Sequence, residues 1–372
     1  MRPILVPATG APSAEPSRPS RRWHHNLLNA LLFFAALAGT GVLLDSGLPF
    51  PDIPLTGEKI RFLSLRGDEF DTIFIGSSRV NFQIIPSLFD TARSRKGITS
   101  RSFNAGVLGM RPPEQGFFLE RVLREPHERL RWVVIELTSL EARTPPTRRH
   151  SARFAFWHDT RRMKLLGTWT LAEWATLRER ASTAEAGAPG WRDFLEPLST
   201  FLMHVRPFFE RRMNLGRASF LNDRLLLTPS QRDKRQLRAA YLGKKQDGWT
   251  SYTEWGTTDR ERYRQTYESR PLRAPAPFYD AASDAAVAAM SQAVVEAGAT
   301  PIFIVPPVIT DRQYFPAPAM AAKMIIWSFT DPQRYPKLFE FENRADDLHL
   351  NTAGAEQFTL ALAERFQELV KE

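Results

Sequence analysis

The hydrophobic positions of the chain fall into two arrangements, short continuous runs and runs at helical spacing. Short apolar runs typical of buried parallel strands occupy residues 71–75, 132–137 and 300–305. Residues 100–105, which are less apolar, are a further candidate strand. Helical spacing of the apolar residues predicts helices over residues 113–125, 284–297 and 352–371. Because strands alternate with helices, the pattern predicts an α/β fold, a three-layer αβα sandwich with a parallel sheet.

A longer apolar segment precedes this pattern. Residues 27–44 carry no charged side chain, and a helix of that length spans about 27 Å, enough for the hydrocarbon core of a bilayer. Arg18, Arg21 and Arg22 come before it, and the next basic residue is Lys59. The positive-inside rule then predicts a single-pass anchor in a bacterial cytoplasmic membrane, with the remaining domain on the periplasmic side.

The segments beside this predicted anchor are polar or rich in Pro and Gly. Residues 1–26 are predicted to be a disordered basic arm in the cytoplasm, and residues 45–57 a linker to a globular domain over residues 58–372. The Ala36-Leu37-Ala38 tripeptide also has the form of a signal-peptidase site, so cleavage remains an alternative to anchoring. Either alternative exports the globular domain.

The alternation of strands and helices stops over about residues 143–277. This stretch is rich in Arg and aromatic residues and contains helical pieces, so it is predicted to be a helical insertion into the α/β domain. Its tryptophans suit either a hydrophobic core or stacking on sugar rings. They are Trp157, Trp169, Trp174, Trp191, Trp249 and Trp255.

Composition narrows the chemistry. The chain of 372 residues has no cysteine, which excludes disulfides, thiolate metal sites and cysteine nucleophiles. Its formal charge of +9 suits an acidic polymer or an anionic lipid surface. The sequence shows no zinc-finger spacing, no RNA-binding aromatic signature and no helix-turn-helix, so nucleic acid is not a predicted partner.

A candidate nucleophile follows the first predicted strand. Residues 71–75 lead into Gly76-Ser77-Ser78-Arg79, and ligands of open parallel sheets bind beyond the carboxyl ends of the strands. A tight turn would explain the same residues. A serine there becomes reactive only if a base lies beside it.

The candidate base lies near the other end of the chain. His349 precedes the last predicted helix, in the run Asp346-Asp347-Leu348-His349. A carboxylate three residues before the histidine can orient the imidazole ring and stabilise the imidazolium. The geometry of a single turn favours Asp346, with its neighbour Asp347 as the alternative.

The three motifs together resemble a known family. Gly-x-Ser follows the first strand, Asn104-x-Gly106-x-x-Gly109 follows the second, and Asp-x-x-His precedes the last helix. This order resembles the SGNH (GDSL-like) hydrolase superfamily, and within it the anchored, exported members associated with polysaccharide or teichoic-acid acylation. The resemblance covers about residues 71–141 and 300–366.

The resemblance implies roles for individual residues. Ser78 would be the nucleophile, His349 the general base and Asp346 its partner, and the backbone N–H groups of Ser78 and Gly109 would bind the oxyanion. The implied activity needs no cofactor and no metal. Two further polar residues near these motifs, Arg79 and Asn104, are candidates for substrate binding.

The chain departs from the family pattern in two places. Ser77 replaces the usual Asp before the nucleophile, and Leu140 stands where the third motif normally supplies an Asn as an oxyanion donor. Either Thr138, Ser139 or Asn104 replaces that donor, or the enzyme is slow, or the protein is not an enzyme.

The predicted function is therefore a membrane-anchored serine esterase or O-acyltransferase. Its substrates would be acyl esters of a cell-envelope or exported polysaccharide, and a multi-pass membrane acyltransferase is a candidate partner for the transferase. The alternative is a catalytically degenerate relative that binds glycan or assists an exopolysaccharide assembly or export complex.

Overall fold

A five-stranded sheet forms the centre of the computed structural model, which describes residues 21–47, 53–125, 127–143, 151–182, 189–212, 241–254 and 259–371. All strands are parallel, in the order β2-β1-β3-β5-β7. Their bounds are β1 Thr72–Ile75, β2 Ser102–Asn104, β3 Trp132–Glu136, β5 Thr300–Val305 and β7 Ile325–Ser328. The prediction of an α/β fold with a parallel sheet is confirmed.

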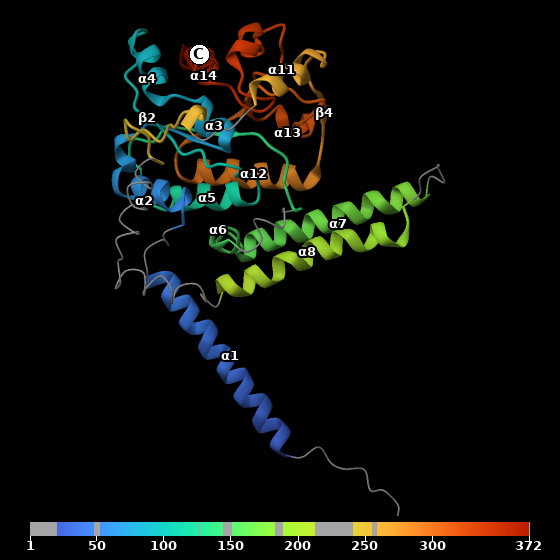
Figure 1. The fold of residues 1–372 in the computed structure, drawn as a ribbon. Helices are drawn as coiled ribbons and strands as arrows, with labels where there is room; N and C mark the ends of the chain where they lie inside the picture. The colour runs from blue at the N-terminus through green and yellow to red at the C-terminus, as the bar shows by residue number, and fades with distance from the viewer. Residues whose placement is uncertain are drawn as a thin grey trace, which may run out of the picture.

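Helices cover both faces of this sheet. Along β1, Ile73 and Ile75 pack into one apolar cluster, whereas Phe74 packs into another on the opposite face, as the two-residue period of a strand requires. Helices α2 Thr56–Arg66, α5 Glu114–Val122 and α12 Ala281–Glu296 contribute to the first cluster, and α4 Pro86–Ser94 and α14 Thr352–Lys371 to the second. The arrangement agrees with three layers (Figure 1).

Some strands were too short for the hydrophobic pattern to find. Strand β7 has four residues at the edge of the sheet. A second, two-stranded parallel sheet joins β4 Ala276–Phe278 to β6 Arg312–Tyr314. Runs of three or four residues do not establish a period, so sequence alone leaves them as loop.

The N-terminal helix α1 covers Arg21–Gly47 and corrects three predicted boundaries. Residues 21–26 of the predicted arm and 45–47 of the predicted linker are helical, because a helix continues beyond its apolar run when the flanking residues tolerate it. At the linker's other end, residues 56 and 57 begin α2, which Ile60 and Leu63 fix to the core. Residues 1–20 and 48–52 lie outside the described residues.

The membrane span stays a prediction. Within the part of the chain that the structure describes, no helix combines the length and the hydropathy needed to cross a membrane. Positions 42 and 44 of the predicted span lie outside the described side chains.

The stretch 143–277 is helical in most of its described part. It contains α6 Ala152–Phe156, α7 Thr160–Ser182, α8 Trp191–Arg212 and α11 Arg260–Glu268. Helices α7 and α8 form an antiparallel pair that projects from the sheet (Figure 1). The stretch also ends in a strand, β4, rather than in a helix. Residues 144–150, 183–188, 213–240 and 255–258, and with them Trp255, lie outside the description.

Candidate active site

The segment after β1 is built for close packing. Ser78 is the first residue of α3 Ser78–Gln83, and the Ser77 hydroxyl caps that helix by accepting the Arg79 N–H at 3.2 Å. A side chain at position 76 would collide with Glu136 and Val80. Glycine therefore lets β3 approach the turn that carries Ser78.

Glu136, the last residue of β3, forms hydrogen bonds with the same turn. Its buried carboxylate accepts the backbone N–H of Ser77 and, at 3.0 Å, the Ser77 hydroxyl. Arg79 Nε lies 2.6 Å from Glu136 Oε1. Arg79, a predicted substrate-binding residue, thus lines the cavity but is held in a buried ion pair, because Glu136 needs a cation to balance its charge.

Ser78 and His349 meet although 271 positions separate them in sequence. The Ser78 Oγ lies 2.8 Å from His349 Nε2, and His349 Nδ1 lies 2.9 Å from Asp346 Oδ2. A proton on Nδ1 is held by Asp346, which leaves Nε2 as the acceptor for the Ser78 hydroxyl. The neighbouring Asp347 points elsewhere and pairs with Arg270 at 2.6 Å.

Asp346 is strongly held as a carboxylate. Burial alone would raise its pKa, but the hydrogen bond and charge of His349, the Leu348 N–H and the Tyr252 hydroxyl outweigh burial and lower the pKa to about 2. The Tyr252 hydroxyl donates to Asp346 Oδ2 at 2.9 Å, and the Tyr252 ring lies 5.1 Å from the His349 ring. The orienting carboxylate therefore stays charged wherever the imidazole acts as a base.

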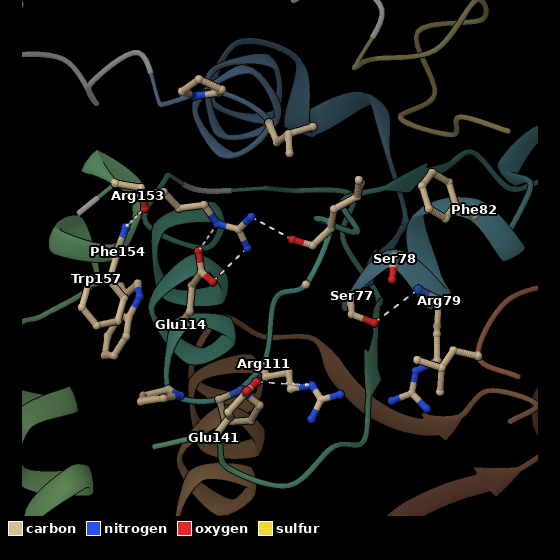
Figure 2. A pocket seen from close by; sticks show the side chains of 18 of the residues that line it. Ser77, Ser78, Arg79, Phe82, Arg111, Glu114, Glu141, Arg153, Phe154 and Trp157 are labelled. Atoms are coloured by element: carbon tan, nitrogen blue, oxygen red, sulfur yellow. Dashed lines mark hydrogen bonds and ion pairs between the residues drawn. The ribbon is translucent and has the colours of Figure 1, made fainter. Parts of the chain in front are cut away.

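A cavity of about 950 Å³ opens in front of Ser78 and His349. Gly109, the second predicted oxyanion donor, lines it and has φ +67°. This is the left-handed region that glycine adopts without strain. Figure 2 shows Ser78 facing the cavity from one side and Arg153, Phe154 and Trp157 lining the other. The volume suits a ligand of several rings or an acyl-sugar unit.

Charged side chains on the far wall are paired with one another. Arg153 binds Glu114 through two hydrogen bonds, at 2.5 and 2.9 Å. Arg111 Nε lies 3.6 Å from Glu141 Oε2. Figure 2 shows both pairs along the cavity wall. The cavity combines these polar pairs with apolar surface such as Trp157, the one tryptophan among its described lining residues.

Asn104, the other predicted substrate-binding residue, does not line the cavity. Its amide nitrogen donates to the carbonyls of Val80, at 2.8 Å, and Ile84, at 2.7 Å, and its amide oxygen accepts the Gly106 N–H at 2.9 Å. These bonds fix the end of α3 to the loop that carries Gly109. Asn104 is thus a positioning residue.

A buried lysine completes this polar network. Lys59 Nζ lies within 3.0 Å of four acceptors, Asn81 Oδ1 and three backbone carbonyls, at positions 104, 106 and 248. Complete burial lowers its pKa to about 7, although the nearby Asp247 acts in the opposite direction. Lys59 ties α2, α3, the Gly106 loop and residues 241–254 together.

The third family donor has no replacement at the expected place. The Leu140 side chain packs into an apolar cluster with Phe117 and Trp157. Neither Thr138, Ser139 nor Leu140 lines the cavity. Ser78 and Gly109, whose N–H groups are the predicted oxyanion donors, both line the cavity, and of the third motif only Glu141 does.

Sequence reasoning missed three residues of the site. Glu136 was visible as a carboxylate inside an apolar strand, a signal that it needs a buried partner. Lys59 lay two residues after the predicted linker and was noted only as the next basic residue after the apolar segment. Tyr252 lies in the unmatched insertion, where no pattern in the sequence marked it.

The last findings concern metal ligands among the described residues and three comparisons with known proteins. In the described ranges, no three His, Cys, Asp or Glu side chains lie close enough to hold a metal ion together. No protein-family model, curated protein or solved structure matches the chain. The resemblance to the SGNH superfamily therefore stays a prediction from the motifs.

Proposed function

We propose that the protein is an SGNH-like serine enzyme that transfers acyl groups from esters, with Ser78, His349 and Asp346 as its catalytic triad. The observation that carries the proposal is the continuous contact from Ser78 Oγ to His349 Nε2 at 2.8 Å and from His349 Nδ1 to Asp346 at 2.9 Å, at the mouth of a cavity of about 950 Å³. Serine, histidine and carboxylate in this order define a triad by geometry.

The proposed reaction has two halves. In the first, Ser78 Oγ bonds to the ester carbonyl carbon while its proton passes to His349 Nε2, and the resulting oxyanion accepts the N–H groups of Ser78 and Gly109. Collapse of the intermediate breaks the ester C–O bond, and His349 returns the proton to the leaving alcohol. In the second half, water or an acceptor hydroxyl attacks the acyl-Ser78 ester, with the same proton transfers in reverse.

The proposed substrate is an acyl ester of a cell-envelope or exported polysaccharide. A cavity of about 950 Å³ with Trp157 on its wall supports a sugar-sized substrate. Hydrolysis and transfer to a sugar hydroxyl share the first half of the reaction, and a multi-pass membrane acyltransferase is the proposed partner for transfer. No step needs a cofactor.

We also propose that α1 anchors the protein in the bacterial inner membrane, with the α/β domain on the periplasmic side. The apolar side chains of α1 are exposed around the helix, including Leu27, Leu31 and Phe34. In Figure 1 this helix points away from the sheet. A helix that is apolar all round and packs against no core suits lipid.

One observation favours a second candidate, a glycan-binding protein without turnover. Leu140 occupies the place of an oxyanion donor, and loss of one such donor costs about 3 to 4 kcal/mol of transition-state stabilisation in tested enzymes. A binding protein would keep the cavity and would not depend on Ser78.

Hydrolysis of p-nitrophenyl acetate by the full-length protein in detergent separates the two candidates. The enzyme predicts turnover that falls to background in Ser78→Ala and persists in the matched control Ser139→Ala, which lies outside the cavity. Turnover equal in the wild type and Ser78→Ala, or glycan binding unchanged by the substitution with no turnover, would favour the binding protein. Adding an oligosaccharide acceptor then distinguishes transfer from hydrolysis by the appearance of acyl sugar.

A further inference from the structure

Helix α8 has a buried face and, opposite to it, an exposed apolar face. One face is buried against α6 and α7 through Pro197, Thr200, His204 and Pro207. The other face carries five large apolar residues, each between 37 and 69% exposed. They are Trp191, Leu195, Leu198, Leu202 and Phe209.

The spacing of the exposed residues makes them a continuous stripe. Intervals of four, three, four and seven residues return to the same side of an α-helix, so the five side chains follow one line along α8. We call this line the α8 stripe. Isolated exposed apolar residues are ordinary on protein surfaces, but a contiguous stripe of this length marks an interaction surface.

The position of the stripe indicates which partner. Helix α8 contacts α1, and in Figure 1 α8 runs across the side of the body from which α1 projects. Because α1 exposes apolar side chains around its length, insertion of α1 into a bilayer would bring the bilayer surface to α8. The stripe and α1 would then contact one continuous lipid phase.

The charge of the helix pair agrees with lipid. Helices α7 and α8 together carry nine Lys or Arg residues against five Asp or Glu residues. On α8, Arg192 and Arg212 are exposed near its two ends, and Trp191 begins the stripe. Basic flanks with an aromatic residue beside an apolar face are typical of helices that lie in the interface of anionic membranes.

We infer that the α8 stripe lies in the surface of an anionic lipid bilayer, beside the point where α1 enters it. This inference rests on the proposed anchor but not on the proposed chemistry. It gives the α7–α8 pair a function: the pair sets the height and tilt of the α/β domain above the membrane. A free anchor with a flexible linker would leave both undefined.

The absence of cysteine allows a direct test, because one introduced cysteine is the unique site for a fluorescent label. Full-length Leu202→Cys, labelled with nitrobenzoxadiazole, is reconstituted into vesicles of phosphatidylethanolamine and phosphatidylglycerol. Lipids with a nitroxide near the headgroup quench labels at the interface. Ala35→Cys, labelled in the same way but tested with lipids that carry the nitroxide deep in the acyl chain, reports on the middle of the proposed span in α1. Lys96→Cys, at an exposed position beyond α4, is the matched control.

The inference predicts that the shallow nitroxide lipid lowers the emission of the Leu202 label at least twofold and leaves that of the Lys96 label unchanged. In vesicles of neutral phosphatidylcholine, quenching of the Leu202 label should be weaker. An unquenched Leu202 label beside a quenched Ala35 label would overturn the inference and leave the anchor standing, and a protein partner would then be the occupant of the stripe. If neither label is quenched, the result contradicts both the proposed anchor and the contact of the α8 stripe with lipid. A quenched Leu202 label beside an Ala35 label that the deep nitroxide leaves unquenched would support contact of the stripe with lipid, but would overturn the anchor and with it the placement of the stripe beside α1.

Discussion

Two pieces of the stretch between Arg143 and Pro277 contact the α/β body in opposite ways. Residues 241–254 insert polar groups into it: the Asp247 carbonyl accepts the Asn104 N–H at 2.8 Å, and Asn81 Nδ2 donates to Thr250 at 2.6 Å. The α7–α8 pair instead packs one side against the body and leaves the α8 stripe exposed. This difference indicates that residues 241–254 act at the candidate site, whereas the α7–α8 pair acts at the surface of the protein.

A buried polar group that loses its hydrogen-bond partner destabilises the fold. Buried hydrogen bonds therefore hold the groups that share them in one arrangement. Residues 241–254 share theirs with α3 and with Asp346, so they belong to the candidate active site. An exposed apolar stripe specifies no internal arrangement, and it belongs to the surroundings of the protein. Changes to the first piece should alter chemistry, and changes to the second should alter location only.

The largest expected effect is the loss of ester turnover when His349, the proposed general base, is replaced. His349→Ala removes the acceptor of the Ser78 proton, and ester turnover should fall at least about a thousandfold, as for other triads. Steady-state hydrolysis of p-nitrophenyl acetate measures the fall, with His25→Ala on exposed α1 as the control. A fall of less than tenfold would mean that Ser78 does not use His349.

The second effect concerns Lys59, which joins residues 241–254 to the nucleophile helix. Lys59→Met keeps the aliphatic volume but leaves buried acceptors unpaired, so the free energy of unfolding should drop by about 2 kcal/mol. Turnover should drop about tenfold as α3 loosens. Chemical denaturation and initial rates measure both, with the exposed Lys96→Met as the control.

The pH dependence of stability sharpens this prediction. An unfolded lysine keeps its proton up to about pH 10, whereas burial lowers the Lys59 pKa to about 7. Between these values the unfolded chain binds more protons than the folded chain, so the contribution of Lys59 makes the free energy of unfolding rise with pH. Lys59→Met should lack this rise, and parallel pH profiles of wild type and variant would contradict the assignment.

A smaller effect is expected at Tyr252, the contact of residues 241–254 with the triad. Tyr252→Phe removes one hydrogen bond to Asp346, so the pKa of that carboxyl should rise from about 2. Because His349 is then less well oriented, kcat should fall roughly fivefold while KM stays within twofold. Exposed Tyr279→Phe is the control. A change in KM alone would place Tyr252 in substrate binding instead.

The smallest effect is expected on the stripe. Leu202→Ser changes an exposed residue, so turnover of a soluble ester should stay within about twofold of the wild type and the free energy of unfolding within about 0.5 kcal/mol. Initial rates and denaturation test both. A large loss of soluble-ester turnover would show that the two pieces are not separate in function.

The sequence predicted those helices and strands whose apolar residues form a clear pattern along the chain. Continuous apolar runs located β1, β3 and β5 and, less sharply, β2, and helical spacing located α5, α12 and α14. The short strand β7 escaped because four residues do not define a period. Helix α2 was not predicted, because the Pro and Gly residues nearby favoured a linker. In the structure, the buried side chain of Leu63 packs this helix onto the core.

The candidate site was predictable where its residues form local motifs. Ser78, Asp346 and His349 are each marked by near neighbours, and the parallel sheet explains why the ends of distant strands meet. Arg79 and Asn104 were predicted to contact substrate because sequence does not reveal a partner such as Glu136, 57 positions after Arg79. Tyr252 depends on a tertiary contact that no local pattern encodes.

The central claim is that His349 activates Ser78 as a nucleophile. Treatment of the full-length protein in detergent with a fluorophosphonate, followed by peptide mass spectrometry, tests it most directly, with His349→Ala as the comparison and circular dichroism as the check on folding. The account predicts one adduct, on Ser78, that is lost or strongly slowed in His349→Ala. A folded protein that gives no adduct, or one labelled on another serine, would contradict it.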